Sequence, residues 1–383
     1  MKYYIISGEA SGDLHGSNLV KQLYLLDAEA DIRCWGGDLM QAAGATLVKH
    51  YRDLAFMGFA EVVKNLPTIL QNIRFCKQDI LSFQPDTLVL IDYPGFNLRI
   101  AEWAKQQGFK VIYYISPQVW AWKANRVKKM KQCIDKMLCI LPFEKKYFRD
   151  TWNWEVEYVG HPLVEVVEKK KQFGVGSLEF GVVHSNPKLQ TPNPKPSLIA
   201  LLPGSRKQEI QKKLPIMLQV ARSFPEYRFV VAQAPGLDDA FYEPFLAAYT
   251  NVSTVRNQTY DLLLQASAAL VTSGTATLET ALFGVPEVVC YKGSNISYQI
   301  AKRLIKIKYI SLVNLIMDKP VVTELIQDEL TPDNLVRELR SLLQDSAKQK
   351  QVQEDYHALK ELLSAGGHAS AQAARIIVDF IRK

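Results

Sequence analysis

Asp92 and Glu9 are the carboxylates in this chain most obviously placed to do chemistry. Asp92 directly follows the apolar run at residues 87–91, and Glu9 follows the apolar run at residues 3–6. A carboxylate after a buried strand either caps the next helix or accepts a proton from an alcohol. From the residue types alone, both roles stay open.

The segment SGEASGDLHG at residues 7–16 surrounds Glu9 with small residues. Glycines permit tight turns there, and the amides at the start of the next helix suit an anion. The segment is neither a P-loop, which needs a lysine, nor G-x-G-x-x-G, nor a G-x-S-x-G nucleophile elbow. It is therefore either a plain strand-to-helix turn or, with Asp13 and His15, a sugar-binding or acid–base segment.

Two turns in the second half of the chain suit a nucleotide diphosphate. Arg206 ends the sequence LLPGSR, where a guanidinium would form paired hydrogen bonds to a diphosphate. The sharper signal is SGTATLE at residues 273–279, where small residues expose helix-start amides and Glu279 could accept both ribose hydroxyls. The plainer alternatives are a surface arginine on a turn and a helix N-cap with an ordinary glutamate in its first turn.

A tryptophan-rich segment, SPQVWAWK at residues 116–123, precedes a basic run with Arg126, Lys128, Lys129 and Lys131. Such a run is a solvated helix face, a phosphate site or a contact for an anionic membrane. No recognised nucleic-acid module accompanies it, so we expect no nucleic-acid partner.

Metal-binding patterns are absent from the sequence. It has no D-x-D, no H-E-x-x-H and no Cys/His cluster, and His161 stands alone. The five cysteines are unpaired by spacing, which argues against a disulfide framework. We therefore expect neither a metal nor another cofactor.

The elements that must position these residues alternate between strands and helices. Apolar runs at 3–6, 87–91, 111–115 and 137–141, then at 198–202, 228–232, 268–272 and 287–291, read as strands buried on both faces. Helical spacing lies between them, as at residues 59–73. This alternation predicts an α/β fold with two doubly wound parallel sheets facing a cleft.

The predicted domain boundaries follow breaks in this alternation. An N-terminal domain at 1–167 precedes a lysine- and proline-rich linker or excursion at 168–196. A C-terminal domain follows at 197–355. A helical tail at 356–383 is expected to pack back on the first domain.

Composition bounds the class of protein. Hydrophobic residues are 48% and charged residues 22% of 383, enough for two cores. No apolar stretch reaches about 18 residues, the length a membrane span needs, and the N-terminus lacks a signal peptide, so we expect a cytoplasmic location. The net charge of +7 suggests anionic partners without choosing among them.

Nine motifs, in order, resemble the lipid-A-disaccharide synthase family over nearly the whole chain. They are SGEASGD (7–13), MGFAEV (57–62), IDYPGFN (91–97), SPQVWAW (116–122), LPFE (141–144), VGHP (159–162), LPGSR (202–206), SGTATLE (273–279), and IAKR (300–303) followed by YISLVNL (309–315). The resemblance implies the GT-B fold, in which two Rossmann-like domains form an inverting, metal-independent glycosyltransferase. It also implies that the domain at 1–167 faces the acceptor and the membrane and that the domain at 197–355 binds the UDP-sugar. The family moves 2,3-diacylglucosamine from UDP onto 2,3-diacylglucosamine 1-phosphate (lipid X), at the inner face of the cytoplasmic membrane of Gram-negative-type bacteria.

Site residues follow from this resemblance by position. The expected catalytic residues are Asp92, as base or its orienter, with Glu9 and Arg206. The expected nucleotide-sugar contacts are Gly204, Ser205, Arg206, Ser273, Gly274, Thr275, Ala276, Thr277, Glu279 and Asn314. The expected acceptor contacts are Gly8, Ser11, Gly12, Asp13 and Trp120. A helix containing Val62, Val63 and Leu66 corresponds to a surface for membrane and acyl contact, and ordinary core packing is its alternative.

One departure and two rival functions remain. Some family members carry Asp where Gly95 stands, which leaves no second carboxylate in that motif here. One rival is a UDP-sugar 2-epimerase of the same fold, and the other is a non-catalytic, membrane-associated protein that binds UDP or lipid. A homodimer is compatible with the sequence.

Overall fold

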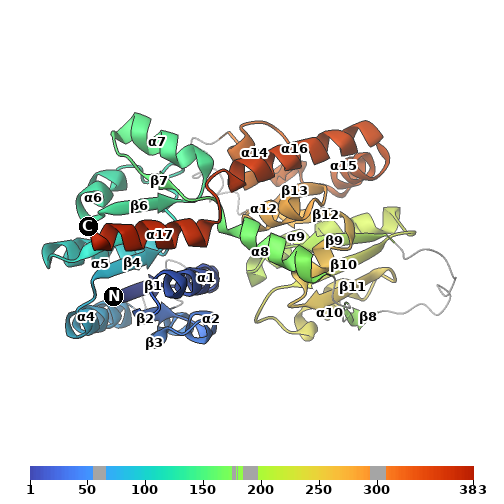
Figure 1. Cartoon of the computed structure of the whole chain (residues 1–383). Coiled ribbons are helices and arrows are strands. Elements are labelled where there is room, and N and C mark those ends of the chain that lie inside the picture. The colour runs from blue at the N-terminus through green and yellow to red at the C-terminus, as the bar shows by residue number, and fades with distance from the viewer. Residues whose placement is uncertain (55–65, 175–177, 179, 184–196, 294–307) are drawn as a thin grey trace. The chain divides into compact units, whose positions relative to one another are not determined.

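The computed structural model describes residues 1–54, 66–174, 178, 180–183, 197–293 and 308–383. The chain divides into two compact units, Met1–Glu165 with Leu363–Lys383, and Val166–Leu362. Each unit is an α/β layer structure around one sheet (Figure 1). The motifs at residues 57–62 and 300–303, and the predicted membrane-facing Val62 and Val63, lie outside the described residues.

The first unit has a seven-stranded parallel sheet in the order β3-β2-β1-β4-β5-β6-β7. Its strands are β1 (Lys2–Ser7), β2 (Asp31–Gly36), β3 (Thr46–His50), β4 (Thr87–Ile91), β5 (Lys110–Tyr114), β6 (Lys136–Cys139) and β7 (Glu157–Tyr158). Its helices are α1 (Ala10–Leu26), α2 (Asp38–Ala42), α4 (Leu66–Phe83), α5 (Pro94–Gln106), α6 (Arg126–Cys133), α7 (Pro142–Trp152) and α17 (Ala369–Arg382), with a short 3-10 turn, η1 (Tyr51–Leu54).

The second unit also has a seven-stranded sheet, in the order β14-β13-β12-β9-β10-β11-β8. From β11 to β14 it repeats the order of the first six strands of the first sheet, and β8 pairs antiparallel with β11 at the edge. Its strands are β8 (Phe180–Val183), β9 (Leu198–Leu202), β10 (Arg228–Gln233), β11 (Val252–Arg256), β12 (Ala266–Thr272), β13 (Glu287–Tyr291) and β14 (Thr323–Ile326). Its helices are α9 (Lys207–Val220), α10 (Asp239–Leu246), α11 (Thr259–Leu263), α12 (Thr275–Phe283), α14 (Leu312–Met317), α15 (Pro332–Gln344) and most of α16 (Ser346–Ser364), with 3-10 turns η2 (Ala221–Ser223) and η3 (Gln327–Glu329).

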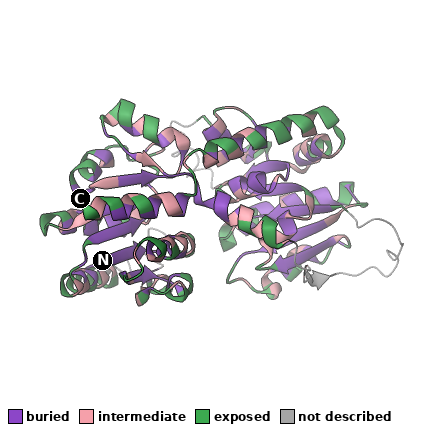
Figure 2. Cartoon of the chain, viewed as in Figure 1, coloured by how far each residue is buried: buried purple, intermediate pink, exposed green. Residues whose placement is uncertain are grey.

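Helices cover both faces of each sheet, so the central strands are buried on both sides. β4 and β9 are buried at all five of their positions, and Figure 2 shows the strands buried while the helices keep exposed outer faces. Their continuous apolar sequences are the ones predicted as strands from composition alone. No helix in the described ranges is long and apolar enough to cross a membrane.

The chain passes from one unit to the other within helices rather than in loops. α8 (Pro162–Phe173) passes from the first unit to the second, and β8 also lies inside the stretch 168–196 that was predicted as linker or excursion. α16 runs straight through the predicted boundary at residue 355. α17 then packs on α1, and Glu165 accepts hydrogen bonds from the amide and hydroxyl of Ser370 at 2.9 and 2.7 Å.

Candidate active site

The candidate reactive residues of the first unit lie where its strand order reverses. β1 pairs with β2 on one side and with β4 on the other, so the chain leaves these two neighbouring strands in opposite directions. Ligands of doubly wound sheets bind beyond the carboxyl ends of strands at such a point. Glu9 follows β1 and Asp92 follows β4, so both predicted carboxylates belong to this edge.

The backbone at Asp92 and Tyr93 is left-handed, with φ of 43° and 47°. Non-glycine residues adopt this conformation at a cost of about 1–3 kcal/mol each, so neighbouring groups must hold it. The Asp92 carbonyl accepts a hydrogen bond from Asn97 Nδ2 at 2.8 Å and another from the Tyr113 hydroxyl. Asn97 and Tyr113, to which no role was assigned from sequence, therefore fix the turn that presents Asp92.

The Asp92 carboxyl is poised to take up a proton near neutral pH. Burial and then the charge of Glu9 raise its pKa to about 6, against a backbone hydrogen bond from Tyr93. The carboxyl group is thus mostly ionised at pH 7. Strong perturbation by burial and a neighbouring charge is typical of catalytic groups.

The small residues of the first turn permit close packing beside these carboxylates. A Cβ on Gly8 would lie 2.4 Å from the Tyr93 ring, and one on Gly12 would lie 2.9 Å from Ser7 Cβ. Ser11 is exposed on the first turn of α1. Of these three predicted acceptor contacts, only Ser11 offers a side chain to solvent, whereas Gly8 and Gly12 provide room for their neighbours.

Asp13, also predicted to bind the acceptor, has a structural role. Its buried carboxylate accepts hydrogen bonds from the amides of Gly37, Leu39 and Met40 at 2.7, 3.1 and 3.1 Å. These amides begin α2 and would otherwise lack partners. The acceptor contact of Asp13 stays a prediction, and these three hydrogen bonds do not support it.

Trp120, the remaining predicted acceptor contact, is held by a buried glutamate. Its indole N–H donates to Glu144 Oε1 at 3.2 Å, and its ring meets Phe143 edge-on. Glu144 also accepts from the Ser116 hydroxyl and from the Leu141 amide. Burial raises the pKa of Glu144 to about 7, and these donors oppose the rise. Glu144 thus joins the turns after β5 and β6 and orients the tryptophan-rich segment.

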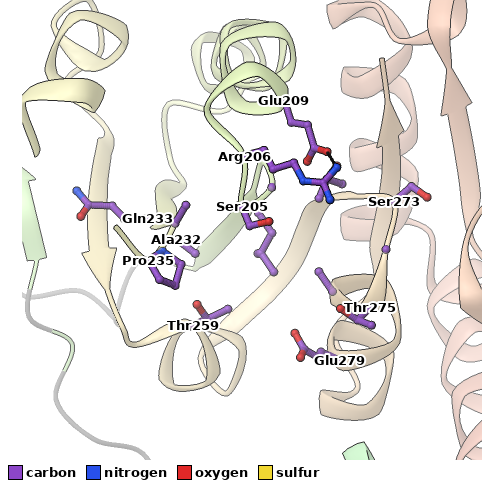
Figure 3. A pocket seen from close by; sticks show the side chains of 16 residues that line it. Ser205, Arg206, Glu209, Ala232, Gln233, Pro235, Thr259, Ser273, Thr275 and Glu279 are labelled. Carbon is purple, nitrogen blue, oxygen red and sulfur yellow. Dashed lines mark ion pairs between the residues drawn. The ribbon is translucent and has the colours of Figure 1, made fainter. Parts of the chain in front are cut away.

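The second unit has its own reversal of strand order, between β9 and β12, and a cavity of about 440 Å³ lies there. Figure 3 shows its lining side chains converging from several turns. The predicted nucleotide contacts that line it are Gly204, Ser205, Arg206, Ser273, Gly274, Thr275, Ala276 and Glu279. Eight residues predicted from sequence are therefore brought to one cavity.

Arg206 lies at the cavity mouth beside an acidic residue that the sequence did not suggest. Its Nη1 is 3.7 Å from Glu209 Oε1, the ion pair drawn in Figure 3. Glu209 Oε2 is 3.8 Å from Nζ of Lys213, which is buried and donates to the Thr272 hydroxyl. Burial lowers the pKa of Lys213, and Glu209 opposes that shift. Two cations thus share one carboxylate along this wall of the cavity.

The turn from β12 into α12 offers donors on one side and a carboxylate on the other. Gly274 has φ of 145°, which lets the chain enter α12 with Thr275 and Ala276 lining the cavity. Their amides belong to the first turn of a helix, where anions are favoured. Glu279 Oε1 accepts from the Tyr260 hydroxyl at 3.1 Å, and burial raises the pKa of Glu279 while that bond opposes the rise.

Thr277 and Asn314, two further predicted nucleotide contacts, do not line the cavity. Thr277 is buried, and both its amide and its hydroxyl donate to the Gly274 carbonyl. Asn314 is buried and hydrogen-bonds to both backbone groups of Val322 and to Glu324. Both nucleotide contacts stay predictions that the cavity does not support, because these polar groups form hydrogen bonds within the unit.

The sequence reading missed one wall of this cavity. Ala232 and Gln233 line it from the end of β10, and Ala234 and Pro235 line it from the turn that follows. Thr259 lines it from the start of α11. Gln233 is held between Asp239 and Arg256. The rule that ligands lie beyond strand ends would have pointed to Gln233, because the preceding strand was predicted.

Known structures share the fold of this chain. UDP-GlcNAc 2-epimerase from Neisseria meningitidis bound to UDP-GlcNAc aligns over 100% of both chains with a TM-score of 0.65 at 13% identity. The calicheamicin glycosyltransferase CalG4 aligns over 100% of this chain and 98% of its own with a TM-score of 0.61 at 18% identity. Such identities establish the fold alone, and the predicted GT-B fold is confirmed.

Sequence relatives are far more specific than the fold. A family model described as lipid-A-disaccharide synthetase matches residues 3–378. The lipid-A-disaccharide synthases of Syntrophus aciditrophicus and Geobacter metallireducens are 38% and 37% identical, each over 99% of this chain and 97% of their own. Since the match spans both units and both strand-order reversals, the chain belongs to the lipid-A-disaccharide synthase family of glycosyltransferases.

Proposed function

We propose that this chain transfers 2,3-diacylglucosamine from UDP-2,3-diacylglucosamine to the 6-hydroxyl of lipid X. The products are the β-1,6-linked lipid A disaccharide 1-phosphate and UDP. The match to lipid-A-disaccharide synthases over nearly the whole chain carries this proposal. It also favours transfer over the epimerase alternative, whose likeness to this chain lies in the fold.

The donor's UDP binds in the 440 Å³ cavity of the second unit. Arg206 and the amides of Thr275 and Ala276 stabilise the negative charge that grows on the departing diphosphate. Glu279 accepts the ribose hydroxyls. Arg206 is catalytic in this sense, because its partner gains charge in the transition state.

Asp92 accepts the proton of the acceptor hydroxyl as that oxygen attacks the anomeric carbon. Inversion needs one base and no covalent intermediate. A pKa of about 6 leaves the carboxylate ionised at neutral pH while keeping it basic. Glu9 supports this role by raising that pKa, and Ser11 and Trp120 contact the acceptor.

Because both substrates are acylated, the enzyme works as a peripheral protein at the inner face of the cytoplasmic membrane. Trp122, which is 53% exposed, and the exposed Lys123, Lys128 and Lys129 support this proposal, since aromatic and cationic side chains suit an anionic lipid surface. The homodimer stays a prediction, and sedimentation analysis of the purified protein would test it.

The direct test is to incubate the purified protein with UDP-2,3-diacylglucosamine and lipid X and to detect the product by mass spectrometry. We expect the disaccharide 1-phosphate and UDP, with turnover that persists in EDTA. Conversion of UDP-GlcNAc without lipid would identify an epimerase instead. UDP or lipid binding without any turnover would identify the non-catalytic alternative.

A further inference from the structure

A second cavity, of about 250 Å³, lies between α5 and α6 of the first unit, and the transfer reaction proposed above assigns it no role. It is lined by Pro94, Gly95, Leu98, Arg99, Glu102, Arg126, Lys129, Met130 and Cys133. We call this cavity the α5–α6 groove. Three of its nine lining residues are cations, so it suits an anionic group.

The charges of the groove are not balanced within it. Lys129 Nζ is 2.7 Å from Glu102 Oε2, which pairs the one acidic lining residue with one of the cations. No ion pair joins Arg99 or Arg126 to a carboxylate in the part of the chain that the structure describes. Among the described residues, two guanidinium charges at the groove therefore have no acidic partner.

The groove begins beside the candidate base. Pro94 and Gly95 line it, and they follow Asp92 by two and three residues, so at most about 11 Å separates the Cα atoms of Asp92 and Gly95. A Cβ on Gly95 would meet nothing within 4 Å, so the groove is open at that end.

Arg126 also lies at the end of the groove near the base. It is the first residue of α6, and Pro94 is the first residue of α5. The two helices pack together, and Pro94, Gly95 and Arg126 line the same groove. Arg126 therefore lies on the side of the groove where the turn that presents Asp92 leads into α5.

We propose that the α5–α6 groove binds the phosphomonoester of the glycosyl acceptor through Arg99 and Arg126. The proposal rests on the function proposed above and names the part of the acceptor that this unit recognises. In a pyranose the carbon that bears the 1-phosphate and the carbon that bears the 6-hydroxymethyl group both bond to the ring oxygen, so the phosphate and the 6-hydroxyl lie close together. A base that precedes the groove and two guanidinium groups that line it match such a short separation.

Charge favours a phosphomonoester over the phosphodiester of a membrane lipid. A monoester carries about −1.5 to −2 charges at pH 7, which balances two guanidinium groups, whereas a diester carries a single charge. Guanidinium groups also match phosphate oxygens with paired hydrogen bonds. The groove is apolar below them, at Leu98, Met130 and Cys133, as the carbon face of a sugar requires.

The first test measures transfer to two acceptors, lipid X and 2,3-diacylglucosamine without its phosphate. In the doubly substituted Arg99→Ala/Arg126→Ala protein, KM for lipid X should rise about 100-fold, and each single substitution should raise it about 10-fold. Transfer to the unphosphorylated acceptor should keep its kcat/KM within about twofold, which also verifies that the variant is folded. Arg149→Ala, an exposed arginine of the same unit that lines neither cavity, should change neither value. An unchanged preference for the phosphorylated acceptor in the double variant would overturn the proposal.

A second test separates this proposal from the proposed function. Glucosamine 1-phosphate is titrated into the protein without donor, and the double variant should bind it at least about 10-fold more weakly than the original chain. If transferase activity is absent but this loss of binding is seen, phosphate binding in the groove is supported and the proposed function is contradicted. If transfer is normal but neither binding nor acceptor preference changes in the double variant, only phosphate binding in the groove is contradicted.

The last experiment measures binding of the original chain and of the double variant to phosphatidylglycerol vesicles. Loss of vesicle binding in the double variant, together with an unchanged preference for lipid X over the unphosphorylated acceptor, would assign the two arginines to the membrane surface and overturn the proposal. Loss of that preference with vesicle binding retained would support it.

Discussion

The two units have the same strand order around their reversal points, but they present different groups there. Beyond β1 and β4 the first unit presents the carboxylates of Glu9 and Asp92. Beyond β9 and β12 the second unit presents Arg206 and helix-start amides together with the carboxylates of Glu209 and Glu279. The fold supplies the position, and a few side chains on the turns decide which charge a ligand meets there.

The turns at the two reversal points also differ in their backbone conformation. The second unit uses glycine where the chain is left-handed, at Gly204 and Gly274. The first unit places Asp92 and Tyr93 in that conformation and holds them with hydrogen bonds from neighbouring side chains. A strained turn that carries a perturbed carboxylate is typical of a reacting group, and a relaxed glycine turn is typical of a binding loop.

The largest effect expected from this contrast is that of Asp92→Asn. Removing a general base should lower kcat by about 10²- to 10⁴-fold, while the Kd of UDP, which binds to the other unit, stays unchanged. Steady-state kinetics and calorimetric titration of UDP measure the two quantities. Asp150→Asn, an exposed aspartate of the same unit, serves as the control. A large change in the Kd of UDP would break the contrast, because Asp92 would then support nucleotide binding.

Arg206→Ala should have an intermediate effect, on binding. Loss of a charged hydrogen bond costs about 1–3 kcal/mol, which weakens UDP binding by about 5- to 150-fold. Arg206→Lys should recover only part of the loss, because an ammonium group cannot form the paired contact. Arg337→Ala, an exposed arginine of the same unit outside the cavity, is the matched control. An unchanged Kd for UDP in the alanine variant would exclude Arg206 from the nucleotide site.

Glu9→Gln should have the smallest effect on turnover. It tests the difference between the two units through the pH dependence of kcat/KM. Burial and the Glu9 charge raise the pKa of Asp92 to about 6, and the base is active only when ionised, so kcat/KM should fall as the pH drops below about 6. Removing the Glu9 charge should lower that pKa and move the acidic limb of the profile to lower pH. Glu29→Gln, an exposed glutamate of the same unit, should leave the profile in place. A profile that does not move in Glu9→Gln would mean that Glu9 does not act on Asp92.

The predicted strands that the structure contains are those with continuous apolar sequence. β1, β4, β5, β6, β9, β10, β12 and β13 were all predicted within two residues at each end. β2 and β11, with the sequences DIRCWG and VSTVR, were missed because charged and hydroxyl residues interrupt them. These two segments form strands because they pair with neighbouring strands in the sheet, which their own composition does not indicate.

The site residues divide in a similar way. Motif and position after a strand were enough to place Arg206, Ser273 and Glu279 at one cavity. The reason is that the turns after neighbouring parallel strands all lie at the same edge of the sheet. The same reasoning could not tell Thr275, which lines the cavity, from Thr277, which turns inward two residues later.

The sequence by itself determined the fold class, the family and the turns on which reactive residues lie, since these depend on local pattern and chain order. Only the tertiary structure decided how each polar group is used. Asp13 and Asn314 are bound by backbone groups distant in sequence, and Lys213 reaches Thr272 from another element. The physical reason is that a buried polar atom must find a partner, and the identity of that partner depends on packing between elements that no local pattern encodes.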